Sequence, residues 1–114
     1  MASISSSYRT SNIASVAAII TLIDAQLTAE NARMVALGGA ATKITGTITL
    51  TVNAENGAGE SFSHKITVSL NCPTLADATT LTAALSTFAT AVETESSYTT
   101  VITTSVNMST SMSN

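Results

Sequence analysis

Residues 44–53 read ITGTITLTVN, and residues 61–70 read SFSHKITVSL. Both stretches alternate between two kinds of residue: every second residue is Ile, Leu, Val, Phe, Gly or His, and the residues between them are Thr, Ser, Lys or Asn. A period of two residues is the pattern of a β-strand that has one face on a core and the other face in water. The connecting residues 54–60 contain two glycines and an asparagine, which are typical turn residues. The two stretches therefore predict a β-hairpin with one apolar face and one hydroxyl face.

The length of the hairpin loop follows from matching the two apolar faces. A two-residue turn at Asn56-Gly57 would place Leu50 opposite Ser63. Because a slip of one residue moves every side chain to the other face, the faces match only when the loop holds an odd number of residues. We predict a loop of three or five residues with a glycine in the left-handed region. A bulge lower in the ladder is the alternative.

A second helix and a third strand follow the hairpin. Pro73 cannot donate to a strand ladder, so it ends the second strand. Thr74 and Asp77 have the spacing of a helix capping box. Apolar residues then recur at helical spacing until Ser96-Ser97, and the stripe consists of Leu75, Ala78, Leu81, Leu85, Phe88 and Val92. Residues 98–108 predict a third strand.

The first helix is expected to begin near Ser11 and to carry an apolar stripe from Ile13 to Leu27. Residues 28–37 either continue this helix up to Gly38-Gly39 or break near Thr28 and form an extended piece at 34–37. Residues 1–10 are interpreted as an N-terminal arm, residues 11–108 as a single domain, and residues 109–114 as a C-terminal tail.

The order of elements is thus helix, strand, strand, helix, strand. Because the second helix returns the chain, the third strand is expected to run parallel to the second and to pair with the first. The predicted fold is an α+β domain with a three-stranded, mainly antiparallel sheet of order 2-1-3. Both helices are expected to cover the apolar face of that sheet.

The composition is unusually poor in charge. Only 10% of the 114 residues are charged, whereas a typical protein has about 25%. Ser and Thr together make up about a third of the chain. Burying a hydroxyl requires only a hydrogen-bond partner, whereas burying a lysine requires a paired charge. Such a surface is suited to being covered by neighbouring protein.

Net charge and hydropathy argue against two classes of partner. The net charge is −3, and four scattered basic residues form no stripe that could bind nucleic acid. The apolar run from Ile13 to Ile23 is too short to span a bilayer, which takes about 20 residues. We interpret this run as a core helix, and a signal-peptide segment after Arg9 is the alternative.

The sequence offers no convincing catalytic or metal-binding motif. His64 lies on the apolar face of its strand, where we expect a hydrogen-bonded structural histidine. Cys72 is eight residues further along, about 25 Å by strand rise, which is too far for a catalytic pair. The lone cysteine fits a reducing compartment. Glu55 and Glu60 flank the hairpin loop in a pattern typical of a solvated turn, with a bound cation as the alternative. We expect no cofactor and no metal.

These observations favour a non-enzymatic structural or assembly subunit. The leading hypothesis is a small phage virion component, such as a capsid, neck or tail protein, made in the host cytoplasm and binding copies of itself or other virion proteins. The alternative is a secreted or surface module that binds a glycan or a host protein. The predicted interface residues are Thr45, Thr47, Thr49, Thr51, Tyr98, Val101, Met108 and Met112.

Overall fold

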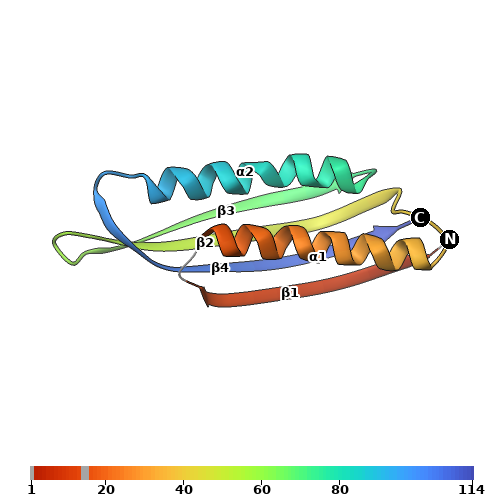
Figure 1. The fold of residues 1–114 in the computed structure, drawn as a ribbon, viewed down its shortest axis with the longest axis horizontal. Helices are drawn as coiled ribbons and strands as arrows, with labels where there is room; N and C mark the ends of the chain where they lie inside the picture. Colours follow the sequence, from red (N-terminus) through yellow and green to blue (C-terminus); the bar gives the residue numbers. More distant parts are fainter. Residues whose placement is uncertain (1, 14–15) are drawn as a thin grey trace.

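The protein is an elongated two-layer α+β domain (Figure 1). The computed structural model describes residues 2–13 and 16–114, and it describes the side chains of residues 2–9, 18–98 and 103–114. The principal-axis extents are 56, 21 and 16 Å. The elements along the chain are β1 (Ser3–Ile13), α1 (Val16–Ala36), β2 (Lys43–Asn56), β3 (Ser61–Cys72), α2 (Leu75–Glu93) and β4 (Tyr98–Ser113).

The sheet has four strands in the order β1-β4-β2-β3, and every neighbouring pair is antiparallel. The predicted three-stranded sheet of order 2-1-3 is therefore wrong, because it lacks the strand formed by residues 3–13. The strand that follows α2 does lie beside β2, and β1 pairs with the opposite edge of that strand.

Two split βαβ units are interleaved in this sheet. β1 and β2 run in the same direction, are joined by α1, and have β4 between them. β3 and β4 run in the same direction, are joined by α2, and have β2 between them. Both helices therefore return the chain over the same face, with α1 over β1 and β4 and α2 mainly over β3 and β2 (Figure 1).

Residues 3–10 of the expected arm and residues 109–113 of the expected tail belong to strands. In β1 the residues directed toward the helices are Ile4, Ser6 and Tyr8, and the hydroxyl in the middle hides the period of two. Gln26 Nε2 donates a hydrogen bond to Ser6 Oγ over 3.2 Å, so this polar position is satisfied beneath α1. Residues 109–113 continue β4 and pair with both β1 and β2.

The core lies between the helices and one face of the sheet. Its fully buried large side chains come from both helices and from every second residue of β2 and β4. They are Ile19, Ile23, Leu27, Met34, Ile44, Ile48, Leu50, Leu85, Met108 and Met112. This layer contains few aromatic rings, so aliphatic packing provides most of the hydrophobic stabilisation.

One carboxyl group is buried within this apolar layer. Glu30 on α1 is fully buried, and the Thr110 hydroxyl lies 2.8 and 2.7 Å from its two carboxyl oxygens. Thr110 pairs with Gly46 of β2, whose φ is +141°. A Cβ on Gly46 would lie 2.1 Å from the backbone oxygen of Ser109, so only glycine fits at this point.

The ends of the elements match several expectations. α1 continues to Ala36, which selects the helical alternative for residues 28–37. The predicted cap at Thr74 is confirmed, because Asp77 N donates to Thr74 Oγ1; the Asp77 carboxylate accepts its hydrogen bond from the Thr74 hydroxyl, whereas in a capping box it accepts from the backbone N–H. The odd-numbered hairpin loop is also confirmed: Glu55 pairs with Ser61, and Gly59 has a φ of +81°.

Candidate functional site

One face of the sheet carries no helix in the part of the chain that the structure describes, and we call it the open face. It is formed by alternate residues of all four strands, and nearly all of them are Ser, Thr or Asn. The hydroxyl and amide members are Ser3, Ser5, Ser7, Thr45, Thr47, Thr49, Thr51, Asn53, Ser61, Ser63, Thr67, Ser69, Asn71, Thr103, Ser105, Asn107, Ser109, Ser111 and Ser113. The described charged members are Arg9, Lys43, Lys65 and Glu55.

The antiparallel register arranges these side chains in rows across the sheet. One row contains Ser7, Ser109, Thr47 and Ser69, one residue from each strand. Neighbouring strands lie about 4.8 Å apart, and successive residues on one face of a strand are about 6.8 Å apart. The open face is therefore a regular array of short hydroxyl groups, which no single strand of the sequence reveals.

Several of these polar groups already bind one another. Thr49 Oγ1 lies 3.0 Å from Thr67 Oγ1, and Asn53 Nδ2 donates to Thr103 Oγ1 over 2.8 Å. Ser5 Oγ donates to Ser111 Oγ over 3.4 Å. A hydroxyl that is paired within its own sheet loses less free energy when water is removed than an unpaired one. The open face can accordingly be covered at a low desolvation cost.

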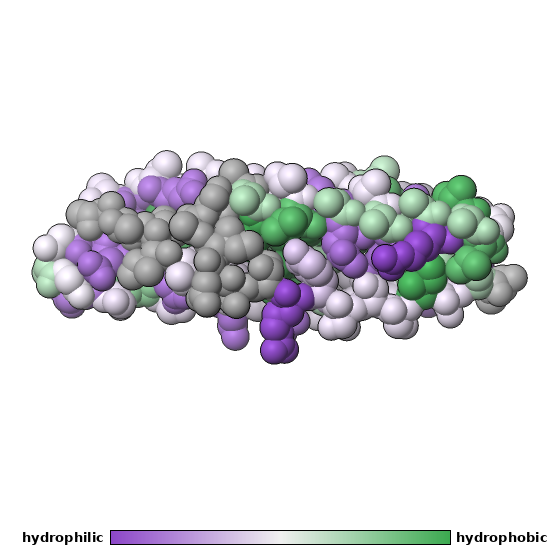
Figure 2. Space-filling model, turned by 60° about the horizontal axis from the view of Figure 1, so that its bottom comes forward, coloured by the Kyte–Doolittle hydropathy of each residue, from purple (hydrophilic) through white to green (hydrophobic). Residues whose placement is uncertain are grey.

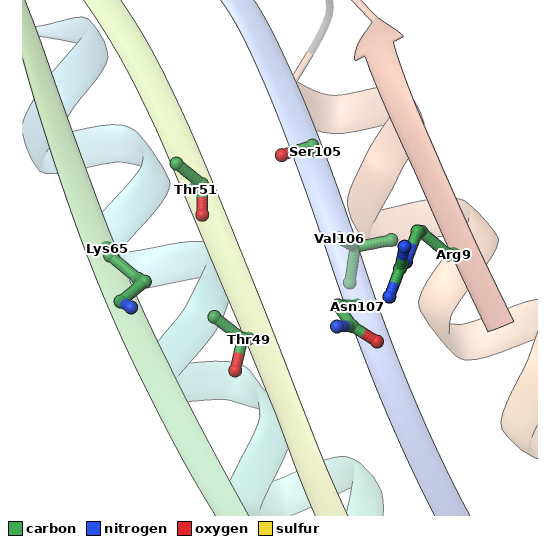
Figure 3. A pocket seen from close by; sticks show the side chains of 7 residues that line it. All are labelled: Arg9, Thr49, Thr51, Lys65, Ser105, Val106 and Asn107. Carbon is green, nitrogen blue, oxygen red and sulfur yellow. The ribbon is translucent and has the colours of Figure 1, made fainter. Parts of the chain in front are cut away.

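A shallow hollow of about 310 Å³ lies near the middle of the open face. Its lining side chains come from all four strands and are Arg9, Thr49, Thr51, Lys65, Ser105, Val106 and Asn107 (Figure 3). Lys65 and Arg9 belong to the two edge strands, and hydroxyl and amide groups fill the space between them. The hollow offers hydrogen-bond donors, hydrogen-bond acceptors and positive charge.

The surface beyond the open face is also weakly polar. Figure 2 shows pale colours between several strongly polar residues and some strongly apolar ones, and apolar residues adjoin one another at the right-hand end of this view. The large exposed apolar side chains among the described residues are Val35, Leu37, Phe62 and Leu81. They come from α1 and the turn after it, from β3 and from α2, so they are too dispersed to define an apolar binding patch.

Seven of the eight predicted interface residues fall into three groups. Thr45, Thr47, Thr49 and Thr51 share the open face. Met108 and Met112 are 1% and 0% exposed, so they fill the core instead of a neighbour's groove. Val101 is in β4, but its side chain lies outside the described residues. Sequence reasoning missed the contributions of β1 and β4, because residues 1–10 and 109–114 were interpreted as tails.

Tyr98 takes part in an aromatic cluster at the hairpin end of the sheet. Its ring centroid lies 5.4 Å from those of both Phe62 and His64. The Tyr98 hydroxyl forms a hydrogen bond with His64 Nε2, which confirms the prediction of a hydrogen-bonded histidine. Phe62 and His64 belong to β3 and Tyr98 begins β4, so the cluster bridges β2 and supports the hairpin.

The remaining polar groups have local structural roles. In the hairpin loop, Asn56 Oδ1 accepts hydrogen bonds from the backbone N–H groups of Ala58 and Glu60, each over 3.0 Å. Cys72 is buried. This burial is the main cause that raises the pKa of its thiol, and the negative charge of the nearby Asp77 carboxylate raises it further. Among the described residues, His, Cys, Asp and Glu side chains form no group of three that could hold a metal ion.

The comparisons with known proteins give little guidance. No family model matches the chain, and no curated protein matches it. A solved complex of a beta-clamp processivity factor with the little finger domain of PolIV aligns with 94% of this chain and 86% of that one. The sequence identity is 6% and the TM-score is 0.34, which is too low to support an argument. Among the described helices, none has the length and hydropathy required to cross a bilayer.

Proposed function

We propose that the protein is a non-enzymatic structural subunit of a larger assembly, such as a phage capsid, neck or tail, and that neighbouring protein covers its open face. The proposal is supported mainly by one observation: an entire four-stranded sheet face lacks a covering layer and carries short hydroxyl side chains where Lys and Glu usually lie. Localisation in a virion is part of this proposal.

The energetics of covering this face favour protein as the covering partner. Short Ser and Thr side chains lose less conformational entropy on ordering than Lys or Glu. Hydrogen bonds within the sheet, such as that between Thr49 and Thr67, satisfy hydroxyls that would otherwise need water. A flat array also allows many van der Waals contacts with a flat partner, and these add up to a large attraction.

The proposal is tested by introducing one charge in the middle of the open face. Thr47 is exposed, so Thr47→Glu leaves the fold of the single chain intact. Burying that carboxylate without a partner costs about 3 kcal/mol or more, which lowers an association constant at least about a hundredfold. Ala58→Glu, which adds the same charge at the exposed hairpin turn, is the matched control.

Light scattering coupled to size exclusion gives the mass of each species, and negative-stain imaging of native particles locates the protein. We expect an oligomer for the wild type and Ala58→Glu, and a mass near 11.6 kDa for Thr47→Glu. A wild-type protein that stays monomeric at all concentrations and is absent from any particle contradicts the proposal.

The hollow favours a second candidate function, the binding of a polar ligand such as a surface glycan. Its donors and acceptors, including Asn107, Thr49 and Ser105, suit hydroxyl-bearing ligands. This candidate predicts a monomer that binds members of a glycan array and loses at least tenfold in affinity after Asn107→Ala. A glycan array that shows no binding by the wild type contradicts it.

A further inference from the structure

We infer that the open face of one copy stacks on the helix layer of a second copy, displaced from the first along the normal of the sheet. The inference deepens the proposed function and rests on it, because it names what covers the open face. It is carried by the distribution of charge between the two faces of the molecule and by the positions of the charged residues along it.

The two faces carry opposite charge in the part of the chain that the structure describes. The open face has three cations, Arg9, Lys43 and Lys65, with the single carboxylate Glu55 near its hairpin end. The exposed charges on α1 and α2 are the carboxylates Asp24, Asp77 and Glu93 and one cation, Arg33. Two open faces brought together would therefore place like charges side by side, whereas an open face on a helix layer would place opposite charges together.

Arg9 and Asp24 lie at nearly the same height along the molecule. Ser6 pairs with Thr110 and contacts Gln26, and Thr110 contacts Glu30, so residues 26–30 of α1 lie over this row. From the middle of that segment, Asp24 is about 6 Å away toward the N-terminal end of α1. Arg9 is about 10 Å from Ser6 in the same direction, because α1 runs back along β1. A difference of about 4 Å is within reach of an arginine side chain.

Lys65 and Glu93 correspond in the same way on the other half of the molecule. β3 ends at Cys72, and α2 begins three residues later and runs back over it. Lys65 is about 24 Å from Cys72 along the strand, and Glu93 is about 27 Å from Leu75 along the helix.

A third correspondence lies at the end of the sheet that is opposite the hairpin. Ile44 pairs with Cys72, and α2 begins three residues after Cys72. Lys43 therefore lies at nearly the same height along the molecule as Asp77 in the first turn of α2, on the opposite face. A single displacement along the sheet normal therefore brings three cations of one copy close to three carboxylates of the next.

The helix layer also fits the open face in shape and size. Ala and Thr dominate the exposed positions of α2, so few long side chains project from this helix. Between α1 and α2 lies a hollow of about 210 Å³ that Asp24 and Ser86 help to line, and it could receive the Arg9 side chain of a neighbour. The two longer molecular extents bound a face of roughly 1,200 Å², which exceeds the roughly 800 Å² per partner of a stable interface.

Such an interface is heterologous, because it joins two different surfaces. When its repeat is a displacement without a closing rotation, it generates an open column of copies. The copy at one end of a growing column then keeps a free open face, and the copy at the other end keeps a free helix layer. This property separates the inference from a symmetric dimer of open faces.

Two double variants test the inference. The face variant, Arg9→Glu with Lys65→Glu, reverses two cations of the open face. The helix variant, Asp24→Lys with Glu93→Lys, reverses two carboxylates of the helix layer. All four side chains are exposed, and a lysine at position 93 suits the C-terminal end of α2, so both variants should fold. Circular dichroism checks this, and analytical ultracentrifugation measures the mass of each variant alone and of a 1:1 mixture.

Stacking predicts that each variant alone is monomeric at concentrations where the wild type forms higher oligomers. The 1:1 mixture should form higher oligomers again, because the intact open face of the helix variant meets the intact helix layer of the face variant, and the two charge-reversed surfaces are complementary to each other. If the helix variant alone assembles like the wild type, or if both variants are monomeric and their mixture does not assemble, the inference is overturned while the proposed function survives. If the wild type itself never associates, both are overturned.

Discussion

At Gly46 the backbone of β4 lies so near to β2 that there is no room for a side chain. Its φ of +141° is strained for every other residue, and a Cβ would lie 2.1 Å from the Ser109 backbone oxygen. We therefore expect Gly46→Ala to lower the free energy of unfolding by about 3 kcal/mol or more, or to prevent folding. Thr47→Ala, one residue away on the open face, should change it by less than about 1 kcal/mol. Urea denaturation of both variants measures the difference, and a Gly46→Ala protein as stable as the wild type contradicts this account of the contact.

Cys72 links stability to pH at the same residue scale. Burial, and then the Asp77 carboxylate, raise the pKa of its thiol above the ordinary value of 9.0. The unfolded chain thus releases this proton at a lower pH than the folded chain does. The contribution of this thiol to the free energy of unfolding is fully present below pH 9.0, and it is lost as the pH rises through the pKa of the folded state.

The prediction is a steeper loss of stability from about pH 8 to about pH 10 in the wild type than in Cys72→Ala. Urea unfolding across this range measures the two slopes, and lysines and tyrosines contribute equally to both proteins. Identical slopes would show that the thiol titrates alike in the folded and unfolded chains.

At the scale of elements, the sequence was informative wherever apolar residues kept one period. Ile48, Leu50 and Val52 alternate without interruption, so β2 and its odd-numbered loop could be predicted together. β1 could not, because Ser6 occupies a position facing the helices and its partner, Gln26, is twenty residues away. The same holds for the open face. Its threonines in β2 could be predicted, but the part formed by β1, one of its four strands, could not.

The free edge of β3 gives a prediction at this scale. Asn56 N–H donates to the Glu60 backbone oxygen next to the pair Glu55 and Ser61, which fixes which residues of the ladder bond to β2. Hydrogen-bonded and non-hydrogen-bonded pairs alternate along an antiparallel ladder. The backbone of Val68 therefore bonds to β2, whereas the N–H and C=O groups of Ser69 point to the free edge. Proline is tolerated where a strand N–H faces solvent.

Ser69→Pro should therefore lower the free energy of unfolding by about 1 kcal/mol or less relative to Ser69→Ala. Val68→Pro should lower it by about 3 kcal/mol or more relative to Val68→Ala, because a ladder hydrogen bond is lost. Thermal or urea denaturation of the four proteins provides both differences. Equal effects of the two prolines would contradict the register of the hairpin.

At the scale of the whole molecule, the two faces differ in charge although the net charge is only −3. Composition alone suggested a surface suited to burial, but the separation of cations from carboxylates depends on the strand order. Arg9 and Lys65 are 56 residues apart in sequence and reach one face only because β1 and β3 are the two edges of the same sheet. An asymmetric molecule of this kind associates most readily in one orientation.

The salt dependence of self-association tests this orientation in the unmodified protein. Raising the ionic strength from about 0.01 M to about 1 M shortens the Debye length from about 30 Å to about 3 Å. Attraction between oppositely charged faces should then weaken, so we expect the association constant to fall at least tenfold in sedimentation velocity measurements. Contact between two open faces would respond in the opposite direction, because salt screens the repulsion among Arg9, Lys43 and Lys65 of the two copies. An association that strengthens with salt would therefore count against the stacked arrangement and in favour of paired open faces.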